Sequence, residues 1–467
     1  MSGKVPSSSK RGNDGALRRL QKRLTPGELQ LDAEVCQRYS GDKWFATSLP
    51  EAVALPVKTE TVSEILRFAS RNRIPVTARG AGYGYVGGCV PVRGGIVLSL
   101  ERMNRIKEIN PDDFVAVAEP GVVTAKLQEE VEKIGRFYPP DPASRADSTI
   151  GGNIATNAGG PRCLKYGVTR EYVLGLEVVL ADGFVVRVGS RTHKNKTGFD
   201  LTKLFVGSEG MLGVVTEATL KLLPLPTFRA ALGVGFNSMP DALGALKDIF
   251  GAGFLPCALE LADQFTLAAA FKRTGSSRLS GCRAHLIIEL DGHAKSVRSE
   301  LKDLETVIQS SSPLFVDRAL GTDAAEKLWQ LRREFSYALR DTGLTKLNED
   351  IVVPRGRLQE LFNFTSGLQK AFGFPVACFG HAGDGNIHVN VMADMSQPGA
   401  KARCDKALDA LFRKVIGLGG VVTGEHGIGL AKKPWWTLAA PKPLRDLHQR
   451  VKGALDPVGI LNPGKFL

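Results

Sequence analysis

The chain has 467 residues, a net charge of +13 and 43% apolar residues. This length exceeds what one hydrophobic core usually organises, so we expect two domains. No stretch approaches the ~18–20 uninterrupted apolar residues of a membrane helix, and the first thirty residues lack the apolar segment of a secretory signal. The basic residues are spread along the chain, which argues against nucleic-acid binding and favours anionic ligands or an acidic partner surface.

The N-terminal region is predicted to be a basic, partly disordered extension that covers residues 1–43. Residues 1–15 are rich in Ser, Gly and Lys, a composition typical of disorder. Residues 17–24 carry leucines at helical spacing among basic residues, which predicts a short surface helix. A mitochondrial transit peptide is a disfavoured alternative, because such peptides are longer and richer in Arg and Ser.

The seven cysteines are scattered along the chain, and no Cys-x-x-Cys pair occurs. Neither an iron–sulfur cluster nor a structural zinc site can be drawn from them. Their use favours a reducing compartment, and we therefore expect a cytoplasmic protein, with association to a membrane through a partner left open.

Alternating strands and helices are predicted for residues 44–226. Residues 51–56 are extended, residues 61–64 have capping-box spacing at the start of a helix, and residues 75–78 form the next strand. Strands at 176–180 and 184–188 flank an Asp-Gly turn, and residues 211–223 supply a further strand. Pro224 and Pro226 then mark a domain boundary.

Longer helices between apolar strands are predicted for residues 227–424. The helices are expected at 297–308, 323–340, 357–372 and 402–418, and the strands at 284–290, 351–353 and 376–379. This pattern indicates an α+β cap domain built on an antiparallel sheet. The last segment, 455–467, is rich in turns but ends apolar, so we expect it to dock on the body of the protein.

Two glycine clusters suit a large anionic cofactor. Five glycines fall within residues 80–88 directly after a predicted strand, and residues 148–160 repeat the pattern with added amide and hydroxyl side chains. Glycine leaves backbone N–H groups open to a phosphate. Either cluster alone is equally consistent with a tight structural loop, and neither is a Walker A or a good Rossmann fingerprint. Two such loops in one domain favour a dinucleotide.

Three histidines near the end of the chain stand beside a carboxylate. His381 and His388 flank a Gly-Asp-Gly turn between two strand-like runs, so a hairpin would bring their imidazoles together. Glu425 lies between Gly424 and His426. Two histidines and a glutamate with an open position suit Zn²⁺, and Mn²⁺ is also compatible. The alternative for each histidine is a hydrogen-bonded core residue.

The sequence is similar to a known protein family. The resemblance is carried by five ordered motifs, at residues 79–88, 139–144, 149–160, 163–167 and 204–217. They resemble the FAD domain of the vanillyl-alcohol-oxidase/PCMH superfamily, and most closely its D-2-hydroxyacid dehydrogenase branch, which includes glycolate oxidase flavin subunits, D-lactate dehydrogenases and D-2-hydroxyglutarate dehydrogenases. The resemblance extends from about residue 44 to residue 467.

The resemblance implies a two-lobed PCMH-type FAD-binding domain at 44–226, a cap domain at 227–424 and a C-terminal segment, 425–467, that packs on the FAD domain. Members usually carry Thr where Tyr83 stands and often His where Arg162 stands, and we expect noncovalent FAD. The implied FAD-binding residues are Arg79, Gly80, Ala81, Gly82, Tyr83, Gly84, Gly87, Gly88, Pro140, Asp141, Thr149, Ile150, Gly151, Gly152, Ala155, Asn157, Gly160, Tyr166, Gly167, Glu209, Gly213, Val214, Val215 and Asn462.

The resemblance also implies roles at the substrate site. His381, His388 and Glu425 correspond to the metal ligands, and His426 to the proton-abstracting base. Arg332, in a Trp-x-x-Arg motif, corresponds to the residue that binds the substrate carboxylate, which agrees with the bidentate grip of a guanidinium.

The expected substrate-binding residues also include Asn390 and Lys346. The hydroxyglutarate branch carries Lys where Asn348 stands, two residues before Asp350, and here Lys346 lies two residues further back. This departure favours a monocarboxylate such as D-lactate or glycolate, with D-2-hydroxyglutarate left open.

The predicted function is FAD-dependent oxidation of a D-2-hydroxyacid to the 2-oxoacid. Without cluster cysteines, electrons must pass to O₂, a quinone, a cytochrome, an electron-transfer flavoprotein or a separate iron–sulfur subunit. An auxiliary flavin subunit that only relays electrons and a flavin-independent metallohydrolase are the alternatives, and a homodimer is left open.

Overall fold

The computed structural model describes residues 13–467 apart from 277, 278 and 280, and it divides into two compact units. Unit 1 consists of residues 13–159, 168–225 and 425–467, and unit 2 consists of residues 160–167 and 226–424. The boundary after Leu225 falls at the predicted Pro224 and Pro226 signal. Most of the segment predicted to be disordered lies outside the described residues, but its last residues begin a helix, α1 (Asp14–Gln21).

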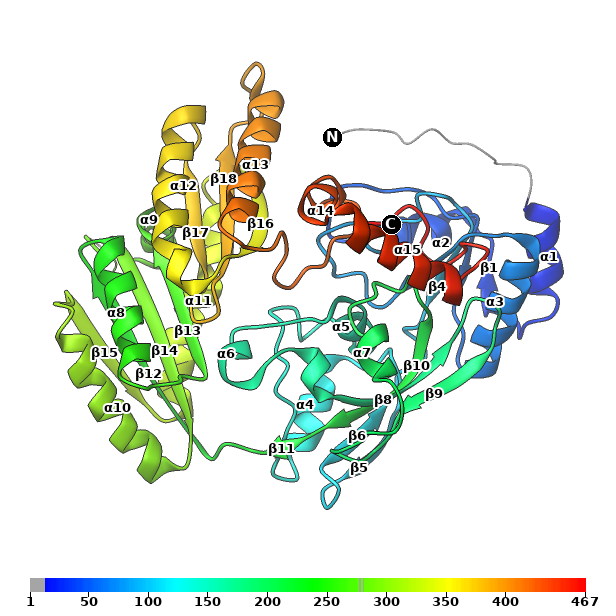
Figure 1. The fold of residues 1–467 in the computed structure, drawn as a ribbon, viewed down its shortest axis with the longest axis horizontal. Helices are drawn as coiled ribbons and strands as arrows, with labels where there is room; N and C mark the ends of the chain where they lie inside the picture. The colour runs from blue at the N-terminus through cyan, green and yellow to red at the C-terminus, as the bar shows by residue number, and fades with distance from the viewer. Residues whose placement is uncertain (1–12, 277–278, 280) are drawn as a thin grey trace. The chain divides into compact units, whose positions relative to one another are not determined.

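The first sheet of unit 1 has the strand order β1 (Leu29–Gln30), β2 (Ala52–Ala54), β4 (Ile96–Ser99) and β3 (Val76–Arg79). Strands β2 and β3 both run parallel to β4. Leu17 and Leu20 of α1 are fully buried in this core, beside the apolar face of α3 (Thr59–Asn72). The predicted N-terminal extension is therefore, from residue 13 onward, an integral part of unit 1 (Figure 1).

The second sheet of unit 1 is antiparallel, with the order β5 (Ile106–Asn110), β6 (Val115–Ala118), β10 (Val214–Lys221), β8 (Val173–Val179) and β9 (Val185–Gly189). The β8–β9 hairpin and the strand before Pro224 confirm the sequence-based expectation. The remaining elements of this unit are α2 (Ala33–Arg38), α4 (Thr124–Glu132), β7 (Arg136–Phe137), α5 (Ile150–Thr156), the 3-10 turn η1 (Thr169–Tyr172), α7 (Leu201–Phe205), β11 (Leu223–Pro224), α14 (Lys433–Ala439) and α15 (Lys442–Leu455).

The predicted capping box at residues 61–64 is wrong. Helix α3 begins at Thr59, two residues earlier, so Thr61 lies inside its first turn. The Thr61 hydroxyl donates to Glu28 instead, and the Ser63 hydroxyl donates to the carbonyl of Gly183. Both hydroxyls thus serve tertiary contacts, which the local spacing could not reveal.

Unit 2 is built on one antiparallel sheet with the strand order β15-β12-β14-β13-β17-β18-β16. The strands are β12 (Phe228–Phe236), β13 (Ala258–Asp263), β14 (Ala284–Gly292), β15 (Phe315–Leu320), β16 (Thr345–Val352), β17 (Val376–His381) and β18 (Asn386–Ala393). The predicted strand at 351–353 is therefore the end of a much longer strand. Both units mix helices with antiparallel pairing, as expected for an α+β protein.

Two groups of helices cover the sheet of unit 2. Helices α8 (Met239–Gly251), α10 (Ala294–Gln309), α12 (Leu358–Phe372) and α13 (Ala400–Gly417) form one group, and α9 (Gln264–Thr274) and α11 (Thr322–Arg340) form the other (Figure 1). The short helix α6 (Cys163–Tyr166) packs on β13, and the 3-10 turn η3 (Arg355–Arg357) precedes α12. None of the helices that the structure describes is long and apolar enough to cross a lipid bilayer.

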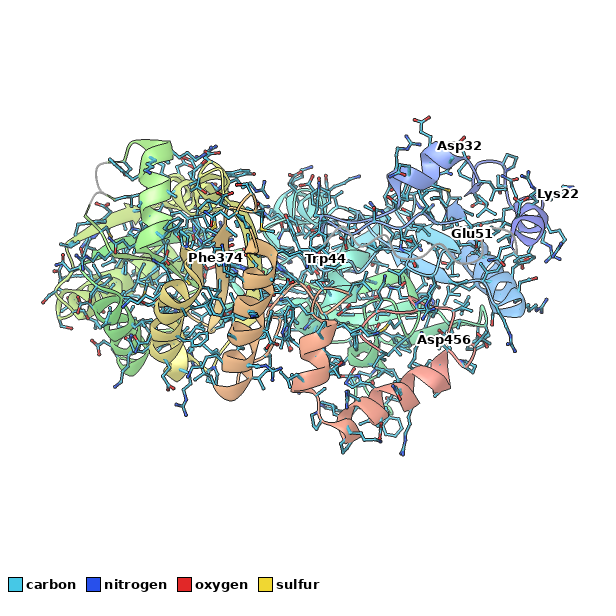
Figure 2. The ribbon with its side chains drawn as sticks, turned by 90° about the horizontal axis from the view of Figure 1, so that it is seen from above. Lys22, Asp32, Trp44, Glu51, Phe374 and Asp456 are labelled. Carbon is cyan, nitrogen blue, oxygen red and sulfur yellow. The ribbon has the colours of Figure 1, made fainter. Side chains whose placement is uncertain are left out.

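The C-terminal segment closes unit 1, as predicted. Asp456, at the end of α15 (Figure 2), accepts hydrogen bonds from the backbone of Gly459, Ile460 and Leu461 and from Lys452. Asn462 then pairs with the first sheet: its Oδ1 accepts from Ala78 N at 2.8 Å. Burial of a carboxylate with four donors fixes the turn that returns the chain to the core.

Candidate active site

The hairpin β17–β18 brings two of the predicted metal ligands together. In its antiparallel register His381 faces Asn386 and His388 faces Phe379. The two imidazole centroids are 5.6 Å apart with the rings nearly perpendicular, and both side chains are buried. Each ring offers a nitrogen within 4.8 Å of the other, so the pair fits two ligands of one ion.

Asp350 ties the segment before Glu425 to this hairpin. The carboxylate is fully buried on β16, and it accepts from Asn386 Nδ2 at 2.7 Å and from the backbone N–H of Gly424 at 2.9 Å. A Cβ at Gly424 would lie 2.4 Å from the Asn386 amide, so only glycine fits there. Glu425 follows by a single peptide bond and is the first residue of the C-terminal part of unit 1.

Glu260 of β13 contacts both halves of the predicted substrate site. Its side chain is 1% exposed, with one carboxylate oxygen on His381 Nδ1 and the other accepting from Arg332 Nε at 2.5 Å. Burial alone would raise the pKa of Glu260, but the charges of His381 and Arg332 outweigh it and lower the pKa to about 2. The group is therefore an ionised acceptor at neutral pH.

Arg332 comes from α11 and projects toward the same sheet face. Its guanidinium lies 4.7 Å from the centre of the Phe379 ring, in cation–π geometry. One turn earlier on α11, Trp329 Nε1 donates to Glu289 at 2.5 Å, and Glu289 also accepts from Arg162 Nε at 2.9 Å. Arg332 and Trp329 of the predicted Trp-x-x-Arg motif thus contact two different buried carboxylates, Glu260 on β13 and Glu289 on β14.

Polar groups on β16 and β18 lie on the same face. Lys346 donates to Ser336 of α11 at 2.7 Å, and burial together with the charges of Arg340 and Arg332 lowers the pKa of Lys346 to about 8. Asn390 is fully buried, faces Asn348 across the strands, and donates to the carbonyls of Ala377 and His388. Among the described residues, the side-chain oxygens of Asn390 and Asn348 have no hydrogen-bond partner.

In unit 1 the two predicted glycine loops lie against each other. A Cβ at Gly80 would be 2.7 Å from the Thr149 hydroxyl and 3.4 Å from the backbone of Gly152. The hydroxyls of Ser148 and Thr149 are buried without a partner among the described residues. Close backbone packing beside unpartnered hydroxyls fits a cradle for the phosphates of FAD.

The Arg79 side chain packs against the first glycine loop. It donates to the carbonyl of Gly41, and a Cβ at Gly82, whose φ is +73°, would overlap the Arg79 guanidinium. Tyr83 projects outward, where its hydroxyl donates to Asp147 at 2.9 Å in an exposed position. A tyrosine therefore fits at this position without disturbing the loop, although the resemblance associates it with threonine.

The predicted base, His426, lies against the first glycine loop. Its imidazole centroid is 5.4 Å from the ring of Tyr85. Two and three residues after His426, the backbone N–H groups of Ile428 and Gly429 donate to the buried carboxylate of Glu209 at 2.7 and 2.8 Å. Burial raises the pKa of Glu209, and these two N–H groups oppose that shift.

Several predicted FAD residues have structural partners within the chain. Glu209 holds the His426 segment, and the Asn462 side chain joins Ala78 N to the carbonyl of Glu209. Gly160, Tyr166 and Gly167 group with unit 2, where the Tyr166 hydroxyl donates to Asp291 at 2.8 Å. The side chains of Glu209, Asn462 and Tyr166 therefore bind other parts of the chain, whereas the resemblance alone would assign these residues to the cofactor.

The other predicted FAD residues lie along the two loops, in the segment at 140–141 and at the start of β10. Helix α5 supplies Ile150, Gly151, Gly152 and Ala155, and Asn157 ends this helix in the left-handed conformation, with φ of 53°. A Cβ at Gly151 would be 2.6 Å from Pro120, which explains the glycine by packing alone. The rest, from loops or β10, are Ala81, Gly84, Gly87, Gly88, Pro140, Asp141, Gly213, Val214 and Val215.

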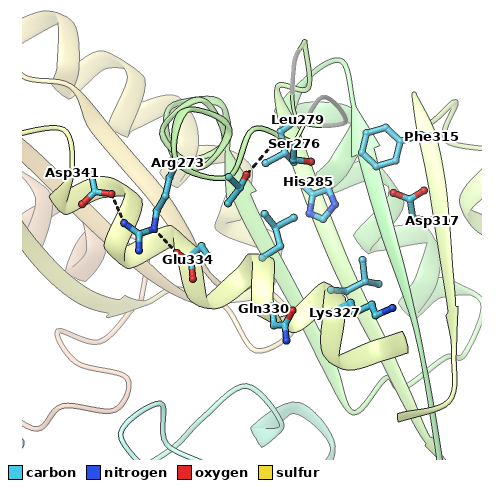
Figure 3. A pocket seen from close by; sticks show the side chains of 13 residues that line it. Arg273, Ser276, Leu279, His285, Phe315, Asp317, Lys327, Gln330, Glu334 and Asp341 are labelled. Atoms are coloured by element: carbon cyan, nitrogen blue, oxygen red, sulfur yellow. Dashed lines mark hydrogen bonds and ion pairs between the residues drawn. The ribbon is translucent and has the colours of Figure 1, made fainter. Parts of the chain in front are cut away.

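A separate cavity of about 820 Å³ lies in unit 2 between α9, α11 and the edge strand β15 (Figure 3). Arg273 donates to Glu334 and Asp341 on its wall, and His285 projects into it from β14. Burial lowers the pKa of His285 to about 4. None of the predicted site residues lines this cavity, so its size does not identify the candidate active site.

Sequence reasoning missed Glu260. A signal was present, because Glu260 is the one charged residue in the apolar run at 257–262. A carboxylate on a buried strand requires a paired partner. Its partners lie 72 and 121 residues away in the chain, so their identity needed the fold.

Two protein-family models match this chain. Residues 50–189 match the model described as FAD binding domain, and residues 225–466 match the model described as FAD linked oxidases, C-terminal domain. The second match alone covers more than half of the 467 residues.

Characterised relatives are similar over most of their length. The chain is 40% identical to glycolate oxidase subunit GlcD of Bacillus subtilis over 419 residues, which are 90% of this chain and 89% of that protein. It is 36% identical to a D-lactate dehydrogenase of Archaeoglobus fulgidus, covering 89% and 91%. It is 32% identical to a D-2-hydroxyglutarate dehydrogenase of Stutzerimonas stutzeri, covering 95% and 97%.

Solved structures share the fold at low sequence identity. A substrate-bound p-cresol methylhydroxylase superposes with a TM-score of 0.80 at 17% identity, covering 99% of this chain and 98% of that chain. A 4-ethylphenol oxidase from Gulosibacter chungangensis gives 0.76 at 20% identity, covering 97% and 96%. These neighbours support the predicted PCMH-type architecture.

Proposed function

Because the chain belongs to the FAD-linked oxidase family of the VAO/PCMH superfamily, we propose that it oxidises a small D-2-hydroxyacid, of the D-lactate or glycolate type, to the 2-oxoacid. The observation that carries the proposal lies within unit 2. There a paired imidazole site, His381 and His388, and a carboxylate-binding arginine, Arg332, are joined through Glu260. A 2-hydroxyacid carries its hydroxyl and carboxylate on adjacent carbons and therefore matches such a two-part site.

The substrate carboxylate is assigned to Arg332. Glu260 occupies its Nε, and no further hydrogen bond of this guanidinium occurs among the described residues. The two terminal nitrogens therefore present the parallel donors that a carboxylate accepts. Asn390 is rigidly held on β18 and offers its side-chain oxygen to the same region.

The metal site is assigned to His381, His388 and Glu425. The histidine pair and the anchored Gly424 that precedes Glu425 support this assignment, and the donor set suits Zn²⁺ or Mn²⁺. When bound, a divalent ion supplies Lewis-acid chemistry that lowers the pKa of the substrate hydroxyl.

His426 is assigned as the general base that removes the hydroxyl proton. It is placed against Tyr85 of the first glycine loop, and the N–H groups that follow it are anchored on Glu209. When bound, FAD in the glycine cradle supplies the acceptor for the hydride from the substrate carbon. The products are the 2-oxoacid and reduced flavin.

Electrons are proposed to leave to a separate acceptor. The seven cysteines are dispersed along the chain and form no disulfide among the described residues, with five of them buried, which argues against a cysteine-ligated cluster in this protein. The similar protein of Bacillus subtilis is named a subunit of glycolate oxidase, which supports a partner protein as the acceptor. Reoxidation of the reduced flavin by oxygen, a quinone, a cytochrome or an electron-transfer flavoprotein tests the alternative acceptors.

A dicarboxylate is the second candidate substrate. Lys346 lies near Arg332, and the charge of Arg332 contributes to the lowered pKa of Lys346. Two neighbouring cations favour a second negative charge between them. A D-2-hydroxyglutarate dehydrogenase is also among the similar proteins.

The test is anaerobic reduction of the purified flavoprotein by D-lactate, L-lactate, glycolate, D-2-hydroxyglutarate and D-malate, followed by the visible flavin band. We expect one D-acid or glycolate to bleach the flavin rapidly. Treatment with EDTA should abolish the bleaching, and Zn²⁺ or Mn²⁺ should restore it. A yellow protein that none of these acids reduces would contradict the proposal and support an auxiliary flavin subunit.

A further inference from the structure

Glu260 is a buried carboxylate that hydrogen-bonds both to the proposed metal ligand His381 and to the proposed carboxylate anchor Arg332. Its position is set by the centre of the sheet. Strand β13 pairs with β17, so that Leu261 faces Gly380 and Ala262 faces Phe379, which places Glu260 beside His381. Arg332 comes from α11, which covers this sheet. The carboxylate is thus enclosed by two strands and a helix.

The two contacts of Glu260 have different consequences. On His381 it contacts Nδ1, and an ionised carboxylate can only accept a hydrogen bond, so Nδ1 must carry the hydrogen. In the neutral ring this leaves the lone pair on Nε2 for a metal ion. On Arg332 it accepts from Nε, which leaves both terminal nitrogens on the opposite edge of the guanidinium.

We propose that Glu260 is a positioning residue that fixes the metal-binding tautomer of His381 and, with its other oxygen, the orientation of Arg332. It thereby sets the distance between the ion that receives the substrate hydroxyl and the group that receives its carboxylate. This inference rests on the proposed function. Carboxylates behind metal-binding histidines orient the ring and strengthen the ligand, and their loss typically lowers metal affinity about 10–100-fold.

A neighbouring carboxylate provides a matched control. Glu289 lies on β14 and is 0% exposed, and it also holds a residue of α11, but its partners are Trp329, Arg162 and Cys257. Glu260→Gln and Glu289→Gln therefore remove the same charge at equal depth from adjacent strands. Only the first change touches His381 and Arg332. A purely structural role for Glu260 predicts the same behaviour for both variants.

The first readout is metal affinity, measured on the full-length flavoprotein by competition with a chromophoric chelator after removal of metal with EDTA. For Glu260→Gln we expect the affinity for Zn²⁺ and Mn²⁺ to fall about 10–100-fold. Glu289→Gln should bind both metals as wild type does, because Glu289 does not contact His381. FAD content, from the visible spectrum, and melting temperature identify any variant that fails to fold.

The second readout is anion binding at saturating metal, followed through the change in the flavin spectrum on titration with pyruvate or glyoxylate. Glu260→Gln should weaken this binding and raise KM by a larger factor than it lowers kcat, because the guanidinium loses its alignment. Glu289→Gln should leave the dissociation constant near that of wild type.

The outcomes separate this inference from the proposed function. If wild type binds metal and is reduced by a 2-hydroxyacid while the two variants behave alike, the role of Glu260 is overturned and the proposed function stands. If no 2-hydroxyacid reduces wild type but Glu260→Gln alone loses metal and pyruvate affinity, the positioning role stands and the proposed reaction fails. If the wild-type protein binds neither Zn²⁺ nor Mn²⁺, both the positioning role of Glu260 and the proposed metal-assisted reaction are overturned.

Discussion

Lys346 of β16 donates a hydrogen bond to Ser336 of α11 at 2.7 Å, and this contact joins the edge strand of unit 2 to the helix that carries Arg332. The ammonium has no carboxylate partner among the described residues, and the nearby charges that shift its pKa are those of Arg340 and Arg332. A partly buried cation whose hydrogen-bond partner is a hydroxyl is poorly compensated in the free protein. An anionic ligand would compensate it.

The Lys346→Met variant tests this compensation. If the substrate carries a second carboxylate, KM for D-2-hydroxyglutarate should rise at least about tenfold, since a hydrogen bond to a charged group contributes roughly 1.5–3 kcal/mol. KM for D-lactate should change little. Steady-state kinetics with both acids measure the contrast, and equal effects on the two would remove Lys346 from the substrate site.

The pH dependence of Lys346 gives a second check. Its pKa in the folded protein is about 8, below the value of a free lysine, so the unfolded chain binds more protons between the two values. Stability should therefore rise as pH increases through this window, and Lys346→Met should abolish this contribution. The measurement is the melting temperature of wild type and of Lys346→Met from pH 7 to pH 10. If the two proteins show the same dependence of melting temperature on pH, Lys346 does not make this contribution.

His426→Ala should lose about 10²–10⁴-fold in the rate of flavin reduction by substrate, the usual contribution of a general base. FAD content should remain normal, because the segment stays anchored through Ile428 N, Gly429 N and Glu209. Single-turnover reduction under anaerobic conditions measures the chemical step. His193→Ala, at an exposed position of unit 1, is the control, and undiminished turnover by His426→Ala would refute the base assignment.

Gly80→Ala should impair FAD binding by spoiling the contact between the two glycine loops. The new Cβ would lie 2.7 Å from the Thr149 hydroxyl, closer than packing allows. We expect a lower FAD content and a lower melting temperature. Gly88→Ala lies in the same loop with nothing within 4 Å, so its apoprotein should melt as wild type does. Equal melting of the two apoproteins would contradict the packing argument.

His285→Leu should make the protein more tolerant of acid. The pKa of the buried imidazole is about 4, and an unperturbed histidine titrates near ~6.5, so the unfolded state takes up the proton first as pH falls. This linkage costs wild type up to about 3 kcal/mol between those pH values. Melting temperatures at pH 7 and pH 4.5 compare the variant with wild type and with His193→Leu. The same acid sensitivity in all three would exclude His285 as its source.

The sequence predicted those features that depend on neighbours along the chain. The long helices of unit 2, the β8–β9 hairpin and the β17–β18 hairpin with its two histidines follow from periodicity and turn residues. Tertiary pairing could not be predicted in this way. Thr61 resembled a helix cap, but its hydroxyl is taken by Glu28, and the leucines of α1 resembled a surface helix, but they complete a core.

The candidate site shows the same difference between local sequence motifs and contacts with distant segments. Its histidines, arginine and glycine loops lie in recognisable motifs, so their residue types were sufficient to propose them as site residues. Glu260 and Asp350 act through contacts with distant segments, and the positions of Tyr166 and Glu209 reflect contacts made by the chain itself. Only coordinates distinguish a side chain that meets a ligand from one that holds the residue beside it.

The return of the C-terminal segment to the first sheet has a consequence for how the protein is made. Asn462 pairs with Ala78 across 384 residues, and the whole of unit 2 is synthesised between them. Until the last residues are synthesised, β3 lacks its bridge between Val76 and Leu461, and the segment after the first glycine loop lacks the buried Lys465, which donates to the carbonyl of Val90. The cofactor cradle can therefore be completed only after unit 2 has been synthesised, and removal of residues 461–467 should impair flavin loading rather than unit 2.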